Sequence, residues 1–210
     1  MKRILLIDDH EIVRIGLKQV IADAFEAPTW GETGNLQEAL PLATQQEWDL
    51  ITLELLIEGN RGLELLKAVK STHTKVPILV ITALPERQYA LRAIKAGASG
   101  FINKSSSSHD LVKAVKKVLT GGRYVSPSLA ETLSADLQRK GPESLHEMLS
   151  DREFQVLRLI GAGKTVGEIA VMLAISDKTV STYRARILDK TGLKNNAEVV
   201  RYVVEHGLLD

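Results

Sequence analysis

The sequence predicts two domains of different fold class, an α/β domain followed by an all-helical domain. In the first half, short apolar runs alternate five times with segments that have helical hydrophobic spacing. In the last third, four helical segments follow one another, several with a capping residue at the start. A length of 210 residues suits one large or two small domains, so the chain has room for both.

The first half is expected to form a doubly wound sheet. The clearest strand follows Pro77, where an apolar run ends at Thr82. The alternation implies a parallel sheet covered by helices on both faces, with ligands at the carboxyl ends of its strands. The predicted strands are residues 3–7, 29–33, 50–55, 78–82 and 100–103, and the predicted helices are residues 11–25, 36–46, 62–71, 86–96 and 109–119.

Polar residues gather where these strands end. Asp8 and Asp9 follow the first strand, Glu54 lies at the end of the third, Thr82 ends the fourth and Lys104 follows the fifth. Each has an ordinary explanation alone, such as a helix cap, a solvated side chain or a loop residue. Five polar residues at strand ends are hard to dismiss together, and they mark this edge of the sheet as the place for a ligand.

Residues 165–193 predict two helices joined by a tight turn. Thr165 with Glu168 makes a capping box, Ser176 caps the second helix after the turn, and Gly192 ends it. The second helix carries Val180, Ile187 and Thr191 on one side. Its opposite side combines small side chains with cations, which suits contact with DNA bases and phosphates, although a solvated surface helix has the same pattern.

The run LSDREFQVLRLIGAGKTVGEIAVMLAISDKTVSTYRARILDKTGL resembles the LuxR-type DNA-binding domain, a four-helix helix–turn–helix fold. The resemblance implies that Ser181, Thr182 and Ala185 contact bases. The remaining predicted DNA-binding residues, chiefly phosphate contacts, are Lys178, Thr179, Tyr183, Arg184, Arg186 and Lys190.

Residues 2 to about 121 resemble the receiver domain of bacterial response regulators, and the whole chain resembles the NarL/FixJ type. This resemblance implies a five-stranded parallel sheet of order 2-1-3-4-5. It also implies that Asp8 and Asp9 hold Mg²⁺, that Thr82 and Lys104 contact a phosphoryl group, and that Phe101 follows the switch.

The sequence departs from that family at the position that accepts phosphate. Glu54 stands where the family has aspartate, and Glu58 replaces the usual proline. An added methylene moves the carboxylate out of line for attack, and its single charge mimics a phosphoryl group only in part. The glutamate is either a natural divergence or a deliberate substitution. We expect no stable phosphate at position 54 and weak Mg²⁺ binding by Asp8, Asp9 and Glu54.

Composition narrows the class of protein. A net charge of +1 means that any attraction to DNA comes from local clusters of cations. The chain has no cysteine, no signal-peptide pattern and no apolar run of membrane-spanning length, and its five histidines lack zinc-ligand spacing. These features predict a cytoplasmic protein without disulfides.

We expect a receiver over residues 1–121, a linker with a helix from Ser126 to Arg139 within residues 122–148, and a DNA-binding domain over residues 149–210. The predicted function is transcription regulation rather than catalysis. The expected partners are promoter DNA, RNA polymerase, a second copy of the chain and a sensor histidine kinase, although Glu54 offers that kinase no aspartate to phosphorylate. Valines within residues 199–204 belong either to a dimer interface or to the domain core.

Two other functions remain open. Paired aspartates near a threonine and a lysine also occur in doubly wound phosphatases, but Asp8-Asp9-His10 lacks the DxD spacing that those enzymes need. Alternatively, the chain is a protein-interaction adaptor with an idle DNA-binding domain, since Ser181, Thr182 and Ala185 carry no charge.

Overall fold

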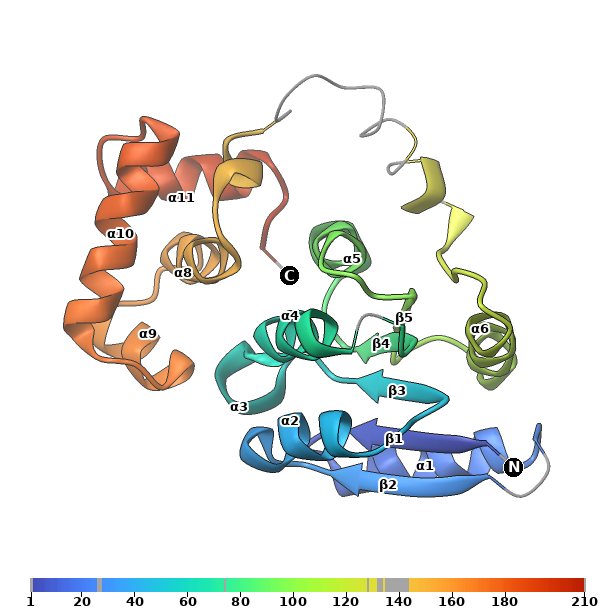
Figure 1. The fold of residues 1–210 in the computed structure, drawn as a ribbon. Helices are drawn as coiled ribbons and strands as arrows, with labels where there is room; N and C mark the ends of the chain where they lie inside the picture. Colours follow the sequence, from blue (N-terminus) through green and yellow to red (C-terminus); the bar gives the residue numbers. More distant parts are fainter. Residues whose placement is uncertain are drawn as a thin grey trace. The chain divides into compact units, whose positions relative to one another are not determined.

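The computed structural model describes residues 2–25, 28–73, 75–127, 129–131, 134 and 144–209. The chain divides into two compact units, residues 1–134 and 135–210. The first unit is an α/β domain and the second is helical in its described part (Figure 1). Each unit is described separately below.

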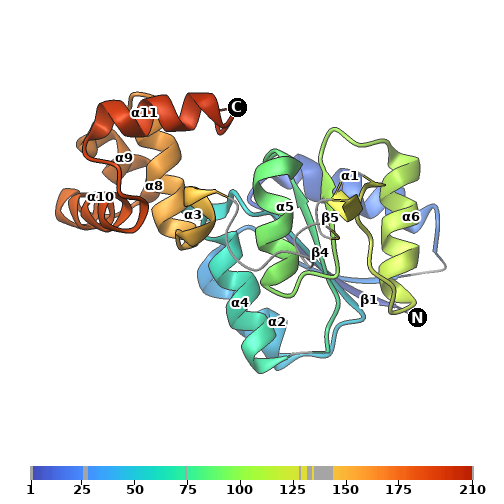
Figure 2. The ribbon, with the colours of Figure 1, turned by 90° about the horizontal axis from the view of Figure 1, so that it is seen from above.

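Five parallel strands in the order β2-β1-β3-β4-β5 form the sheet of the first unit, as the sequence predicts. Helices cover both of its faces, with α1 and α6 on one and α2, α4 and α5 on the other (Figure 2). The strands are β1 (Arg3–Ile7), β2 (Thr29–Thr33), β3 (Leu50–Leu53), β4 (Ile78–Thr82) and β5 (Gly100–Asn103). The helices are α1 (Glu11–Ala22), α2 (Leu36–Gln45), α3 (Ile57–Asn60), α4 (Gly62–Thr72), α5 (Glu86–Lys95) and α6 (Ser108–Leu119).

Several boundaries differ from the prediction. Strand β3 ends at Leu53, two residues early, and α1 ends at Ala22 rather than at residue 25. The short helix α3 was not predicted, because four residues are too few to show a helical period. Helix α6 begins at Ser108, with Ser107 as the cap that accepts a hydrogen bond from the amide of Asp110 at 3.2 Å.

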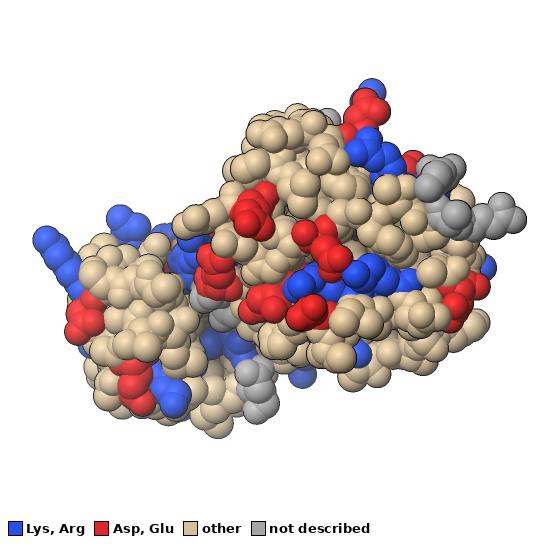
Figure 3. All heavy atoms as spheres, turned by 90° about the horizontal axis from the view of Figure 1, so that it is seen from below, with Lys and Arg blue, Asp and Glu red and all other residues tan. Residues whose placement is uncertain are grey.

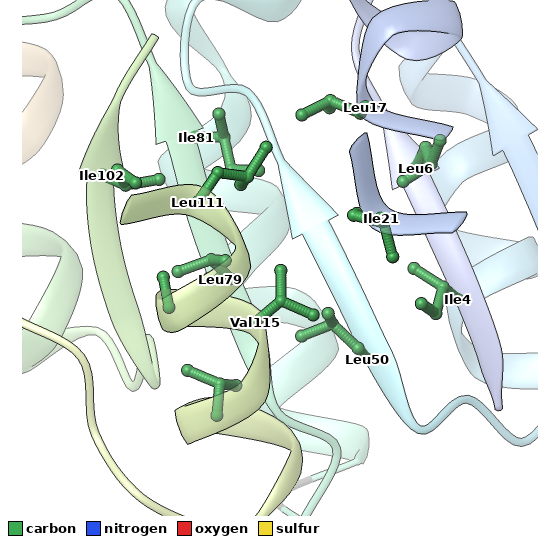
Figure 4. Packing of buried hydrophobic residues seen from close by; sticks show 12 residues of the cluster. Ile4, Leu6, Leu17, Ile21, Leu50, Leu79, Ile81, Ile102, Leu111 and Val115 are labelled. Carbon is green, nitrogen blue, oxygen red and sulfur yellow. The ribbon is translucent and has the colours of Figure 1, made fainter. Parts of the chain in front are cut away.

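The hydrophobic core lies between the sheet and the pair α1 and α6. Figure 4 shows Leu17 and Ile21 of α1 and Leu111 and Val115 of α6 packed over the strands. These side chains are 9% exposed or less. All five residues of β4 are buried, which matches a central strand covered on both faces. Burial of this core holds the carboxyl ends of the strands at fixed spacing.

The second unit packs four α-helices and a short 3₁₀ helix. They are η1 (Leu145–Met148), α8 (Asp151–Gly161), α9 (Val166–Leu173), α10 (Asp177–Thr191) and α11 (Asn196–Glu205). The predicted caps are present: capping boxes begin α8 and α9, Ser176 caps α10, Asn195 caps α11, and Gly192 ends α10 with φ of 72°.

Helix α11 belongs mainly to the core of this unit. Val199 and Val203 are fully buried, and Tyr202 is 7% exposed. A Cβ on Gly161 of α8 would lie 2.4 Å from Val203, so a glycine is needed where the two helices meet. The core alternative for these valines is therefore confirmed, whereas Val204 is 58% exposed.

The predicted linker helix, residues 126–139, falls largely on residues that the structure does not describe. Its start is visible, since the amide of Ala130 donates to the carbonyl of Ser126 at 3.0 Å. The prediction for the rest lies outside the described residues.

Candidate functional site

The polar residues predicted at the strand ends come together at one edge of the sheet. Lys104 follows β5, and its Nζ lies 2.7 Å from Asp8 Oδ2 after β1 and 2.7 Å from Glu54 Oε2 after β3. Parallel strands bring their carboxyl ends to the same edge, which is why residues so distant in sequence meet here. One ammonium group thus bridges two carboxylates.

Glu54 is held by groups from three directions. The Thr82 hydroxyl donates to Glu54 Oε1, and the amide of Leu56 donates to the same oxygen at 2.8 Å. The other oxygen takes Lys104. Glu54 is 2% exposed and Thr82 is fully buried. Hydrogen bonds from these protein donors therefore replace the hydrogen bonds that the carboxylate would make with water.

Lys104 stays charged in this pocket. Burial lowers the pKa of its ammonium group, but the hydrogen bonds to Asp8 and Glu54 and their charges outweigh burial, so the pKa lies above the usual lysine value. The lysine therefore neutralises much of the repulsion between the two carboxylates.

Asp8, Asp9 and His10 form an acidic cluster beside this pocket. Their candidate ligand atoms all lie within 4.8 Å of one another. His10 Nδ1 is 2.8 Å from Asp9 Oδ1, and the His10 amide donates to Asp8 Oδ1 at 2.9 Å. Carboxylate oxygens are the ligands that Mg²⁺ prefers. However, Lys104 already holds Asp8 Oδ2, so an ion would compete with a cation of the protein.

Glu58 contacts the start of α2, whereas Phe101 lies within β5. The Glu58 carboxylate accepts a hydrogen bond from the amide of Leu36 at 3.0 Å, at the first turn of α2, and Glu58 has a positive φ of 40°. It therefore ties the segment after Glu54 to α2, a contact that proline could not make. Phe101 lies on β5 and is 2% exposed.

In the second unit, α10 sorts its side chains as the sequence predicts. Val180, Ile187 and Thr191 are buried. Thr179, Tyr183 and Arg184 are half-buried. The exposed predicted DNA-binding residues are Lys178, Ser181, Thr182, Ala185, Arg186 and Lys190.

The turn before α10 is tight because Ala174 adopts a left-handed conformation, with φ of 53°. Ser176 then accepts a hydrogen bond from the amide of Thr179 at 3.1 Å. Alanine rarely adopts positive φ, so the packing of α9 against α10 holds it there.

Two cations of α10 have partners within the unit. Lys190 Nζ lies 2.7 Å from Glu153 Oε2 of α8, whose side chain is 3% exposed. Arg184 Nε donates to Asn196 Oδ1 at 2.6 Å. Lys190 thus balances a buried carboxylate, whereas the partner of Arg184 is neutral and leaves its positive charge in place.

Family models match both units. The model of the response regulator receiver domain matches residues 4–116, and that of the bacterial regulatory proteins of the luxR family matches residues 147–203. The chain belongs to the response regulators. With its LuxR-type domain, this response regulator is a DNA-binding transcription regulator, in a family of regulators rather than enzymes.

Full-length relatives support this assignment. The response regulator is 31% identical over 211 residues to the response regulator GacA of Pseudomonas viridiflava, covering 100% of this chain and 99% of that protein. It is 29% identical to the response regulator UvrY of Escherichia coli K12, covering 99% of this chain and 96% of the relative.

Solved structures of other response regulators resemble it as well. A LuxR-family two-component response regulator from Aurantimonas sp. SI85-9A1 is 31% identical, with a TM-score of 0.57 over 66% of this chain and 99% of that one. RcsB of Salmonella enterica serovar Typhimurium, bound to promoter rprA with phosphomimetic BeF3-, has a TM-score of 0.65 at 24% identity and covers 97% and 99% of the two chains. The second likeness shows the fold alone.

On the face of the response regulator that Figure 3 shows, acidic and basic side chains lie beside one another. The net charge of the whole chain is +1. In the described part of the chain, no helix has the length and apolar character needed to cross a bilayer.

Sequence reasoning missed two contacts: the one between Glu58 and α2 and the one between Lys190 and Glu153. The spacing of Ser150 and Glu153 signalled a capping box, which is present. Nothing in the sequence signalled that the same carboxylate would also bind a cation 37 residues away.

Substituting Lys190 with methionine is expected to destabilise the second unit by about 1–2 kcal/mol at neutral pH, a value discounted for the partial exposure of the lysine. Burial raises the pKa of Glu153, but hydrogen bonds from Lys190 and Ser150 outweigh it, so the pKa lies below the usual glutamate value. The contribution is therefore present above that value and lost as pH falls through the folded-state pKa. Denaturant unfolding at several pH values measures the change in the free energy of unfolding, and the substitution Lys194→Met, at an exposed lysine, is the control. An equal loss at low and neutral pH would contradict the ion pair.

Proposed function

We propose that this response regulator binds promoter DNA with α10 and acts there with RNA polymerase. The observation that carries the proposal is the exposed side of α10, where Ser181, Thr182 and Ala185 lie beside Lys178 and Arg186. Small side chains allow a helix to approach base edges, and cations bind phosphates. Thr179, Tyr183 and Arg184 flank this side, and Lys190 contributes less because Glu153 holds it.

We further propose that Glu54 occupies the phosphoacceptor position and makes the receiver independent of phosphorylation. Its carboxylate already bonds with Thr82 and Lys104, the two side chains expected to contact a phosphoryl group. A fixed carboxylate supplies about half of the charge of a phosphoryl group. A sensor histidine kinase would then have no acceptor aspartate at this position.

Mg²⁺ binding, in this proposal, is weak. Asp8 and Asp9 offer the hard oxygen ligands that the ion needs, and Lys104 competes for Asp8 and Glu54.

We expect calorimetric titration with Mg²⁺ to give binding with a dissociation constant in the millimolar range, and we expect the Asp9→Asn variant to lose this binding. Tight binding would contradict this account.

The proposed domains are the receiver (1–121), the linker (122–148) and the DNA-binding domain (149–210).

We place the dimer contact on α1 of the receiver, where a second copy of the chain would bind. Ile12 and Ile15 are 76% and 50% exposed. The same helix borders a cavity of about 270 Å³. Its apolar lining comes from α1 (Val13, Gly16, Leu17 and Val20), the strands (Ile81 and Ile102) and α6 (Leu111), and its polar lining is Asn103, Lys104, Ser106, Ser107 and Ser108.

The exposed isoleucines and the cavity lie on the same helix. Such a surface can be complementary to itself, as an interface with two-fold symmetry requires. A Cβ on Gly16 would meet no atom within 4 Å, so the cavity is open at that point.

Binding of genomic promoter fragments tests the DNA proposal. If Lys178, Arg184 and Arg186 each displace one counterion, log affinity falls with log salt with a slope of about −2.7 per subunit. Arg186→Ala should reduce the slope by about one, while Lys164→Ala, outside α10, should leave it unchanged. A full-length chain that binds no fragment, yet captures protein partners, would favour the adaptor alternative.

Incubation with radiolabelled acetyl phosphate and Mg²⁺ tests the role of Glu54. The chain is expected to take up no stable label, whereas Glu54→Asp restores a carboxylate of the length that the family uses and should become labelled. Glu58→Asp, at a carboxylate outside the pocket, serves as the control. Stable label that maps to Glu54 would overturn the proposal.

Sedimentation equilibrium tests the dimer contact. Ile12→Glu and Ile15→Glu place a charge on the apolar surface and are expected to weaken self-association at least about tenfold. Gln19→Glu, one turn further along α1, is the control for added negative charge. Unchanged association in both isoleucine variants would place the interface elsewhere.

A further inference from the structure

The start of the linker is built into the fold of the receiver. The amide of Tyr124 donates to the carbonyl of Ser99 at 3.0 Å, and the amide of Phe101 donates to the carbonyl of Tyr124 at 3.1 Å. Tyr124 thereby forms a parallel bridge with Gly100 at the edge of β5. A Cβ on Gly100 would lie 2.8 Å from the Tyr124 carbonyl oxygen, so glycine is needed for this approach.

A second contact ties the linker to α5. The Ser126 hydroxyl donates to Glu86 Oε1 at the first residue of α5, and it accepts from the amide of Leu129 at 3.1 Å. Leu129 is 5% exposed. We call Tyr124, Ser126 and Leu129 the strap. It is held by backbone pairing at one end and by a hydrogen bond to a carboxylate at the other.

The strap contacts the start of α5, and the loop that follows Thr82 leads into the same point. The amide of Leu84 donates to the Thr82 hydroxyl at 3.2 Å, and that hydroxyl donates to Glu54. The Asn103 side chain, next to Lys104, donates to the carbonyl of Leu84 at 3.1 Å. The loop is therefore tied to the carboxylate pocket on one side and leads into Glu86 on the other.

We propose that the strap is the output element of the receiver: Glu86 and Ser126 are positioning residues that couple the hydrogen bond between Thr82 and Glu54 to the start of the linker. The chain of contacts runs from Glu54 through Thr82 and Leu84 to Glu86, Ser126 and Leu129, and Pro85 alone separates Leu84 from Glu86 along the chain. A change of the side chain at position 54 therefore alters how firmly the contact between Glu86 and Ser126 holds the start of the linker. Only the last step, a consequence for DNA binding, rests on the proposed function.

Residue-resolved amide hydrogen exchange of the full chain tests the coupling. Ser126→Ala is expected to speed exchange at Tyr124 about tenfold, although the direct hydrogen bonds of that amide are unchanged, because loss of a hydrogen bond to a charged group loosens the whole strap. Glu86→Ala should do the same, and the double variant should be no faster than either single variant. Ser134→Ala, whose hydroxyl donates only to the carbonyl of Ala130 among the described contacts, is the control.

The link to the pocket is tested by a double-mutant cycle. Thr82→Val should speed exchange at Tyr124 in the natural sequence and have little effect when Ser126 is already alanine. Glu54→Gln serves the same purpose if the valine variant does not fold, and protected amides of Ile4 and Ile81 show that the sheet is intact. Equal effects in both backgrounds, or no effect of Ser126→Ala at Tyr124, would overturn the proposal.

DNA binding measured on the same variants separates this inference from the proposed function. Ser126→Ala should change the dissociation constant at least about threefold and Ser134→Ala should not. An unchanged constant with a loosened strap would overturn the output role. Failure of the natural sequence to bind any promoter fragment would instead count against the proposed function, and the exchange result would still stand.

Discussion

The ammonium group of Lys104 is the interaction on which the receiver pocket depends. It lies between carboxylates that follow two different strands, and it comes from the end of a third. Two carboxylates a few ångströms apart in a poorly solvated site repel each other by several kcal/mol, so they need a cation or a proton. Lys104 therefore supplies the positive charge that offsets the repulsion between Asp8 and Glu54.

The side chain of Glu54 is long enough for its two oxygens to reach different donors. One oxygen accepts from Thr82 and from the amide of Leu56, and the other contacts Lys104. Side chains thereby join the ends of β1, β3, β4 and β5, in addition to the backbone pairing between neighbouring strands. Such a satisfied polar network is rigid, because each partner fixes the rotamer of the next.

The fold could be predicted from periodicity, and the site from strand ends. Strands β1, β4 and β5 have the predicted bounds, because apolar runs flanked by turns mark them. Strand β2 also has the predicted bounds, although its sequence TWGET is only a weak strand signal. Strand β3 is shorter because Glu54 turns back to accept the amide of Leu56, a contact set by tertiary structure. The positions of Asp8, Thr82 and Lys104 followed from the sheet topology. The contacts of Glu58 and Lys190 could not be predicted, since both join segments whose spacing in the sequence carries no period.

The edge of β5 has a further consequence for how the protein behaves in a crowded solution. An unpaired sheet edge is a template on which another chain can add a strand, and natural proteins protect such edges. Here Tyr124 occupies one end of that edge, while on the opposite edge strand β2 carries Glu32, which is paired with Arg14 and Lys18. The same residue that anchors the linker therefore also guards the receiver against aggregation by strand addition.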